Sequence, residues 1–290
     1  MENVCTYMLA GLTKNIFRYR RDVVRTNLEH SFPDKDQQEI KRIEDDFYRH
    51  FAEIVREAVR FGRFRGPKGK ERLRRSGLCV IQDPEAHAED FGRMRGMMVL
   101  TSHCGNWETL GGWFAYAPEG SLGYTERDIA VVYKRLSSGF WERVMSRRRL
   151  GPLEGTGFDG YVESSNVLRY ALQHRDDKKV FVFPTDQFPY RGASRHETED
   201  FLHQKTLTMT GGAALAHKLG MGVVYQRCRC ISSGHYGWEF VKICDDASLM
   251  EPGDIMNTYY RLLQQDIEAQ PWNWLWTHKR WKNLYDYEKK

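Results

Sequence analysis

The sequence contains no apolar run long enough to cross a membrane. Its N-terminal apolar segment, residues 4–17, is interrupted by Gly11, Lys14 and Asn15, whereas a spanning helix needs about 20 mostly apolar residues. A cleavable signal peptide, with a basic start and a small-residue cleavage site, is not evident either. These two absences predict a chain that does not itself span a membrane.

Cysteine is scarce, and its spacing argues against two kinds of site. Six cysteines in 290 residues do not form the framework of a small disulfide-rich protein, so we expect reduced thiols. Cys228, Cys230 and Cys244 lack the C-x2-C spacing of structural zinc sites, and alternate residues of a strand simply share one face. We therefore expect no bound metal ion.

The motifs of two common enzyme classes are also missing. The nearest approach to the G-x-S-x-G motif of serine hydrolases is GASRH at residues 192–196, which lacks the last glycine. Residues 155–160 fit G-x-G-x-x-G, but a dinucleotide-binding fingerprint follows an apolar strand and opens a helix. Here the glycines follow the basic residues 147–149. We therefore predict a loop at 155–160 and no resident cofactor.

The most informative segment that is present is MMVLTSHCGNWE, residues 97–108. Residues 97–100 form a short apolar run that is typical of a buried strand. Apolar side chains then recur at helical spacing, at Trp107, Leu110, Trp113 and Phe114. His103 is therefore predicted to lie on a strand-to-helix turn. Ligands of open α/β sheets collect beyond the carboxyl ends of strands, so this histidine is expected to face a substrate.

A histidine paired with a carboxylate is suited to general-base chemistry. The unperturbed imidazole pKa, about 6.5, is close to working pH, and a carboxylate on its second nitrogen fixes the tautomer. Glu108 contacts His103 only if residues 104–106 form a turn, for which Gly105 and Asn106 are suited. The alternative is that His103 caps the following helix. Cys104 adjoins the histidine, and we expect it to line the site rather than act as a nucleophile.

The pattern of apolar segments predicts an α/β fold. Apolar runs at residues 97–100, 129–133, 180–183 and 222–225 alternate with helical patterns. This alternation indicates a mainly parallel sheet flanked by helices on both faces. No linker divides the chain, so we predict a single domain over residues 1–290.

Residues 36–64 are predicted to form an amphipathic helix. Asp36 and Glu39 fit a capping box at its start, and apolar residues follow at steps of three and four. These are Ile40, Ile43, Phe47, Phe51, Ile54, Val55 and Val59. Such a face packs on a protein core or lies on a membrane surface, and the sequence leaves both alternatives open.

Positive charge exceeds negative charge by 44 minus 39, a net charge of +5, and it is clustered. Residues 60–75 hold eight basic residues against one acidic residue, and 147–149 are three arginines. Such clusters fit an acidic carrier protein, lipid phosphates or an anionic membrane surface, although they also occur in solvated loops. The GPKG sequence at 66–69 predicts a loop. No recognisable nucleic-acid-binding motif accompanies the clusters, so we expect no nucleic-acid partner.

The chain resembles the bacterial lipid A biosynthesis acyltransferases of the lauroyl and myristoyl transferase type. These are related to glycerolipid acyltransferases with an H-x4-D/E motif, which His103 and Glu108 match. The resemblance runs almost end to end. Its other landmarks, in the expected order, are residues 19–33, Tyr133 with Lys134, Asp186 with Gln187, and the closing motif WLWTHKRW at 274–281.

This resemblance implies a glycerolipid-acyltransferase-like fold and transfer of a fatty acyl chain from an acyl carrier protein thioester to a hydroxyl of a lipid A precursor. It implies that His103 is the general base and that Glu108 orients its imidazole, with no covalent enzyme intermediate. The residues expected to contact substrate are Asn106, Trp107, Tyr133, Lys134, Asp186 and Gln187. Lys134, Asp186 and Gln187 have a structural alternative as solvated strand ends.

The resemblance also implies attachment at the cytoplasmic face of a Gram-negative inner membrane, against an anionic membrane surface. Residues 1–17 are then expected to be a residual or truncated anchor region. Two alternatives remain open. The chain could acylate another glycolipid or an aminolipid, or it could be a non-catalytic basic lipid- or RNA-binding module on the same scaffold. The presence of both His103 and Glu108 favours an enzyme.

Overall fold

A computed structural model describes residues 4–135, 138–190 and 192–287. Within these ranges seven strands form a central sheet in the order β1-β9-β8-β2-β5-β3-β4. Their bounds are β1 Cys79–Ile81, β2 Met97–Thr101, β3 Ile129–Tyr133, β4 Tyr161–Glu163, β5 Val180–Pro184, β8 Gly222–Ser232 and β9 His235–Cys244. Neighbouring strands are parallel except in the β8–β9 hairpin. The predicted mainly parallel sheet is confirmed.

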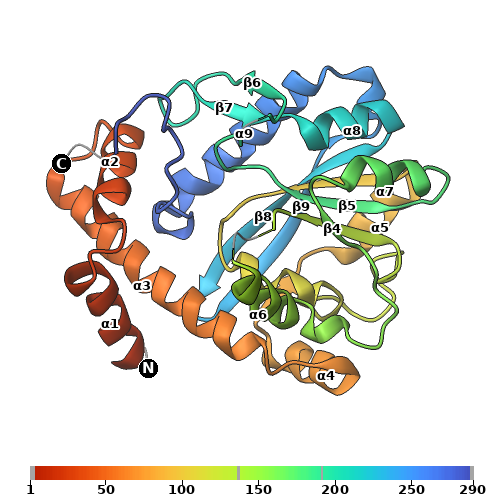
Figure 1. Ribbon diagram of the computed structural model, residues 1–290, viewed down its shortest axis with the longest axis horizontal. Helices are drawn as coiled ribbons and strands as arrows, with labels where there is room; N and C mark the ends of the chain where they lie inside the picture. The colour runs from red at the N-terminus through yellow and green to blue at the C-terminus, as the bar shows by residue number, and fades with distance from the viewer. Residues whose placement is uncertain (1–3, 136–137, 191, 288–290) are drawn as a thin grey trace.

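Helices cover both faces of this sheet (Figure 1). The chain crosses the sheet from β1 to β4 through α5 (Pro84–Arg93), the 3-10 helix η2 (Trp107–Ala115) and α6 (Gly139–Arg149). It returns from β4 to β8 through α7 (Val167–Gln173) and α8 (Gly211–Leu219). Because crossovers between parallel strands are right-handed, the outward and returning helices lie on opposite faces. Helix α9 (Pro252–Ala269) contacts α8 and β8. The predicted α/β architecture is confirmed.

The four predicted apolar runs are the four central strands β2, β3, β5 and β8. Strand β2 lies between β5 and β8, and all five of its residues are buried. This explains why its sequence is apolar at consecutive positions rather than alternating, since a parallel strand inside an α/β fold is covered on both faces. In the register of the β2–β5 pair, Thr101 lies opposite Pro184. The residues that follow these two strands therefore emerge side by side.

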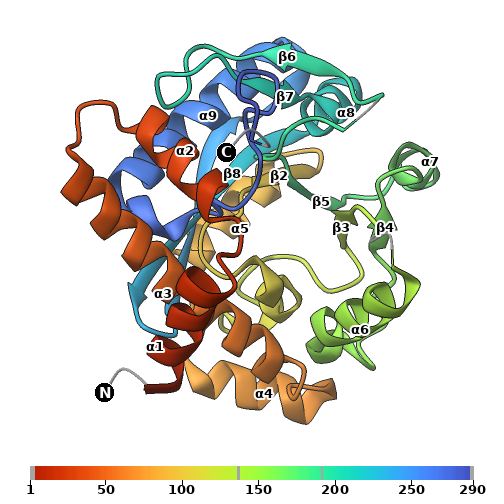
Figure 2. The same cartoon turned by 60° about the vertical axis from the view of Figure 1, so that its left-hand side comes forward.

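The predicted helix at 36–64 is present as α3 (Gln37–Phe61), and its predicted capping box is confirmed. Asp36 Oδ1 accepts hydrogen bonds of 2.8 Å from the backbone N–H groups of Gln38 and Glu39, and Glu39 accepts from the Asp36 N–H at 3.2 Å. Most of its apolar face is buried, including Ile40 and Phe47 in the hydrophobic core. Of the two alternatives for this helix, packing on the core is therefore the correct one. Figure 2 shows α3 running beside α1 (Val4–Gly11) and α2 (Arg21–Ser31).

The predicted loop at 66–69 is wrong, because these residues form the first turn of α4 (Gly66–Ser76). Pro67 is compatible with this position, since the first turn of a helix does not use its backbone N–H groups. The basic cluster on α4 is partly neutralised by acidic neighbours. Arg74 and Arg75 pair with Glu71 at 3.0 and 2.8 Å, and Lys70 pairs with Glu126.

The N-terminal segment consists of α1 followed by a π-helical turn, Leu12–Ile16. Lys14 in this turn is buried and pairs with Glu44 and Asp45 of α3 at 3.2 and 2.6 Å. Among the described residues, no helix has the length and apolar character needed to cross a bilayer. The role of residues 1–17 as an anchor region stays a prediction.

Candidate active site

His103 lies directly after β2, where the sequence predicts it, and faces Asp186 directly after β5. The His103 side chain donates from Nδ1 to Asp186 Oδ1 over 2.6 Å, and its backbone N–H donates to Oδ2 over 2.7 Å. The contact follows from the register of the two strands. Thr101 and Pro184 lie opposite each other, and His103 and Asp186 each come two residues later.

Asp186 is a buried, ionised carboxylate. Its side chain is only 2% exposed, and Trp274 Nε1 donates to Oδ2 over 2.8 Å. Burial by itself would raise its pKa, but the charge of His103 and the hydrogen bonds from His103 and Trp274 lower the pKa to about 2. The carboxylate therefore accepts a hydrogen bond from the Nδ1–H group and fixes the tautomer of the imidazole. His103 Nε2 is left as the basic nitrogen, 3.1 Å from the amide nitrogen of Gln187.

Glu108 does not occupy the position that the sequence analysis expects. Arg149, at the end of α6, donates from Nε and Nη2 to the two Glu108 oxygens, both over 2.7 Å. In the described part of the chain no hydrogen bond joins Glu108 to His103, and Asp186 takes the predicted place of Glu108 at the imidazole. The reason lies in the turn at 104–106, because Gly105 adopts φ +63° and Asn106 caps η2. These two residues direct Glu108 towards α6.

Asn106 and Trp107 complete this turn. The Asn106 side chain is buried, accepts from the Glu108 backbone N–H at 3.2 Å, and donates to Glu57 Oε2 at 2.8 Å. Both of its polar atoms are thus used inside the protein. Trp107 is half-buried, and its ring lies 5.2 Å from the His103 ring. Of the two, Trp107 is the residue whose side chain packs against the His103 ring.

Tyr133 and Lys134 lie at the end of β3. The Tyr133 ring stacks on Tyr161 with ring centres 3.8 Å apart. Tyr161 OH lies 3.5 Å from Arg149 Nη1, which extends the Glu108–Arg149 pair towards β3. Lys134 is exposed, and its ammonium lies 4.6 Å from the centre of the Tyr190 ring. Their contact with substrate stays a prediction.

Cys104 belongs to the core rather than to the site. Its side chain is buried, and its backbone bridges to Trp274. Burial raises the pKa of the thiol well above its usual value, so the thiol stays neutral. This environment is unsuited to a thiolate nucleophile.

The family model for bacterial lipid A biosynthesis acyltransferases matches residues 2–283, nearly the whole chain. The chain belongs to this family. It is therefore an acyltransferase of the lipid A type. A lipid A precursor as its substrate is consistent with membership of this family. The search of curated proteins gave no match.

Two landmarks of this acyltransferase family, residues 19–33 and 274–281, are joined by hydrogen bonds. Asn27 of α2 donates from its amide to the backbone oxygens of Trp276 and His278, both over 2.9 Å. His278 Nε2 accepts from the Phe188 N–H at 3.0 Å, and this contact holds the segment that carries Asp186. Burial, with a smaller effect of nearby Arg280, lowers the pKa of His278 to about 4, so this ring is a neutral acceptor.

Sequence reasoning missed four residues of this acyltransferase site. Trp274 was seen only as part of a motif, and Arg149 only as part of a basic cluster. Asn27 lay in the landmark at 19–33 and Tyr161 in none, and neither showed its partner, because the partners lie in distant segments.

Replacing Gly105 by alanine is expected to lower the free energy of unfolding by about 2–4 kcal/mol. Gly105 adopts φ +63°, and a Cβ atom added there would lie 2.3 Å from Cys228 Sγ and 3.2 Å from the Tyr236 ring. Urea titration measures the loss. Gly120→Ala is the matched control, since Gly120 adopts φ +77° but has no atom within 4 Å of its added Cβ. Equal losses in the two variants would contradict a steric role for Gly105.

Replacing Glu108 by glutamine is expected to lower the free energy of unfolding by about 1–3 kcal/mol, because it leaves the half-buried Arg149 without its charged partner. Turnover is expected to fall by about 100-fold as the turn carrying His103 shifts. Arg149→Gln should produce the same losses, and the double variant should lose little more than either single variant. Losses that add in the double variant would show that the two side chains act independently.

Proposed function

We propose that this acyltransferase transfers a fatty acyl chain from an acyl carrier protein thioester to a hydroxyl of a lipid A precursor, with His103 as the general base. The observation that carries this proposal is the pair of His103 Nδ1 with buried Asp186 at 2.6 Å, which leaves Nε2 as the ring nitrogen that can take a proton. The site lies at the carboxyl ends of β2 and β5, where α/β sheets bind ligands.

In the proposed step the acceptor hydroxyl takes the place of the Gln187 amide at Nε2. Nε2 removes the hydroxyl proton as the oxygen attacks the thioester carbonyl, so a C–O bond forms. The C–S bond of the thioester then breaks. The imidazolium gives its proton to the departing sulfur, so that the carrier protein leaves as a thiol. Asp186 stabilises the imidazolium throughout, as the aspartate of a catalytic triad does. No covalent bond to the enzyme is needed, which agrees with the buried, neutral Cys104.

Glu108 supports the base indirectly in this proposal. Its ion pair with Arg149 fixes the start of η2 to the end of α6, and Asn106 joins that helix to the His103 turn. Glu108 is therefore a positioning residue. Lys134, exposed at the end of β3, is suited to hold a phosphate or the developing negative charge.

We further propose that the enzyme works at the cytoplasmic face of the inner membrane. Phe140 and Trp141 at the start of α6 are 67% and 56% exposed, and the arginines 147–149 follow on the same helix. Aromatic residues beside cations are suited to the interface of an anionic membrane. Basic side chains near the site also suit an acidic acyl carrier protein.

The test is acyl transfer from a panel of acyl carrier protein thioesters to a lipid A precursor, followed by mass spectrometry of the acceptor. An acceptor whose mass increases by one acyl group supports the proposal. Release of that acyl group by mild base shows that it is attached as an ester. Transfer only to another glycolipid or to an aminolipid would support the acyl-transfer reaction but show that the proposed acceptor is wrong. No transfer to any acceptor, together with salt-dependent lipid or RNA binding, would favour the binding-module alternative.

A further inference from the structure

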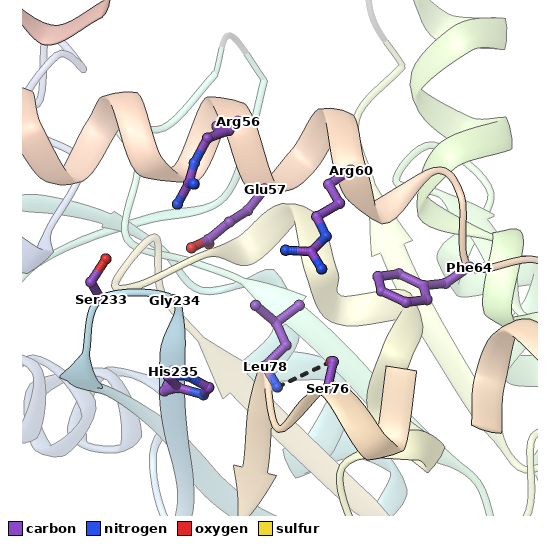
Figure 3. A pocket seen from close by; sticks show the side chains of 9 residues that line it. All are labelled: Arg56, Glu57, Arg60, Phe64, Ser76, Leu78, Ser233, Gly234 and His235. Carbon is purple, nitrogen blue, oxygen red and sulfur yellow. Dashed lines mark hydrogen bonds between the residues drawn. The ribbon is translucent and has the colours of Figure 1, made fainter. Parts of the chain in front are cut away.

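A cavity outside the His103 site lies between α3, the residues just before β1 and the turn of the β8–β9 hairpin. Its volume is about 330 Å³, which is within the range of small-molecule sites. Figure 3 shows Arg56, Glu57 and Arg60 reaching into it from α3, with Leu78 and His235 on the opposite side. None of the residues that line it belongs to the His103 site.

Two arginine guanidinium groups line the cavity. In the described part of the chain neither Arg56 nor Arg60 forms an ion pair, and Arg56 Nε is buried with no hydrogen-bond partner. The nearby carboxylate of Glu53 is already engaged, since it accepts from Ser233 Oγ at 2.5 Å and lies 3.9 Å from His50. Two guanidinium groups in this arrangement favour an anion with more than one acceptor oxygen.

Glu57 supplies a polar atom that also lacks a partner. Its side chain is only 6% exposed, and Oε2 accepts from Asn106 at 2.8 Å and from Tyr236 OH at 3.0 Å. The other oxygen, Oε1, is buried and forms no hydrogen bond with any residue that the structure describes. Burial raises the pKa of this carboxyl group. An unpaired buried oxygen is costly, so a proton shared between Oε1 and a ligand would stabilise both.

We propose that this cavity binds a phosphate monoester, with Arg56 and Arg60 on the phosphoryl oxygens and Glu57 Oε1 sharing the remaining proton. A phosphate monoester has its second pKa near 6, close enough to neutral pH for its dianion to share a proton with a buried carboxyl group, whereas sulfate is too weak a base to do so. Phe64 and Leu78 line the same cavity and provide an apolar wall for the organic part. This chemistry is common to a free phosphorylated metabolite and to a lipid headgroup.

The proposed site is joined to the catalytic turn by one residue. Glu57 Oε2 holds the Asn106 amide, and Asn106 caps η2 three residues after His103. A ligand that orders Glu57 therefore acts on the turn that carries the general base. The binding proposal itself does not depend on the acyl transfer proposed above, and its test measures binding alone.

Calorimetric titration with phenyl phosphate and with inorganic sulfate tests the proposal. The wild-type protein should bind phenyl phosphate and prefer it to sulfate. Arg56→Gln and Arg60→Gln should each weaken binding by about tenfold or more. Arg42→Gln, on an exposed position of the same helix, and His103→Ala, in the other site, should leave binding unchanged. Because Arg60 is exposed, its variant tests the proposal even if the Arg56 variant folds poorly.

Glu57→Gln gives the sharper test of proton sharing. The amide oxygen should take the place of Oε2, because Asn106 and Tyr236 both donate there, and the NH2 group should face the cavity. This group donates equally to either anion, so the preference for phenyl phosphate over sulfate should disappear while binding persists. A wild-type protein that binds sulfate as tightly as phenyl phosphate would overturn the proton-sharing proposal.

Vesicles distinguish the two sources of the phosphate. Phosphatidylcholine vesicles with phosphatidic acid carry a phosphate monoester, and those with phosphatidylglycerol carry only diesters. Binding to the first alone, weakened by Arg60→Gln, would support a lipid headgroup, and binding of phenyl phosphate in solution without binding to either kind of vesicle would support a free metabolite. Binding of neither form, or binding that is unchanged in both arginine variants, would overturn the proposed site.

Discussion

His103→Ala is expected to lower kcat for acyl transfer by about 10²–10⁴-fold, the usual contribution of a positioned general base. The variant keeps the strands and Asp186 but removes the only group that the proposed mechanism uses to take the hydroxyl proton. The KM values for both substrates should change far less, because the imidazole acts mainly in the transition state. Steady-state kinetics with mass-spectrometric detection of the acylated product measures both effects.

The chain contains a matched control for this variant. His174 donates from Nδ1 to Asp177 Oδ2 over 2.6 Å, the same length as the His103–Asp186 bond, but this pair is exposed. His174→Ala should leave kcat unchanged. If acyl transfer survives in His103→Ala at the wild-type rate, the general-base assignment is wrong, and the base must be sought elsewhere at the carboxyl ends of β2 and β5.

The central part of the fold was predictable because its signals are local. Consecutive apolar residues at 97–100 and 180–183 identify buried strands, and a capping box with an apolar face identifies α3. The error at 66–69 has the same origin. Glycine and proline favour turns on average, but here proline falls in the first turn of a helix, which tolerates it.

The pairing within the site was not predictable from spacing alone. Glu108 is five residues from His103, and the H-x4-D/E motif with a turn at 104–106 predicted it as the partner of the imidazole. The actual partner, Asp186, is 83 residues away and is brought there by the register of β2 and β5. Asp186 was expected to contact substrate, with a solvated strand end as the alternative, but it is buried and pairs with His103, because nothing in the sequence aligned the two strands. Arg149 was hidden for the same reason, 41 residues from Glu108.

Asp186→Asn is expected to lower kcat by up to about 10⁴-fold, the effect of the equivalent change in a catalytic triad. The geometry explains why such an isosteric change is severe. Oδ2 accepts from two donors, the His103 backbone N–H at 2.7 Å and Trp274 Nε1 at 2.8 Å. The amide oxygen of the asparagine must take this position, because an NH2 group there would face both donors.

The asparagine NH2 group then lies at the position of Oδ1, against His103 Nδ1. It can only donate, so Nδ1 becomes the acceptor and the ring proton moves to Nε2. The imidazole would be held in place with its basic nitrogen facing Asp186 instead of the substrate. We therefore expect a folded enzyme with the wrong tautomer, in which kcat falls while KM changes little.

Nitrogen-15 NMR of the histidine side chains distinguishes this explanation from simple loss of structure. In the wild-type protein the neutral His103 ring should carry its proton on Nδ1, and in Asp186→Asn on Nε2. Asp177→Asn, in the exposed pair, is the control and should leave kcat unchanged. If Asp186→Asn keeps the proton on Nδ1 and retains wild-type turnover, Asp186 does not orient the base, and its burial beside His103 serves stability alone.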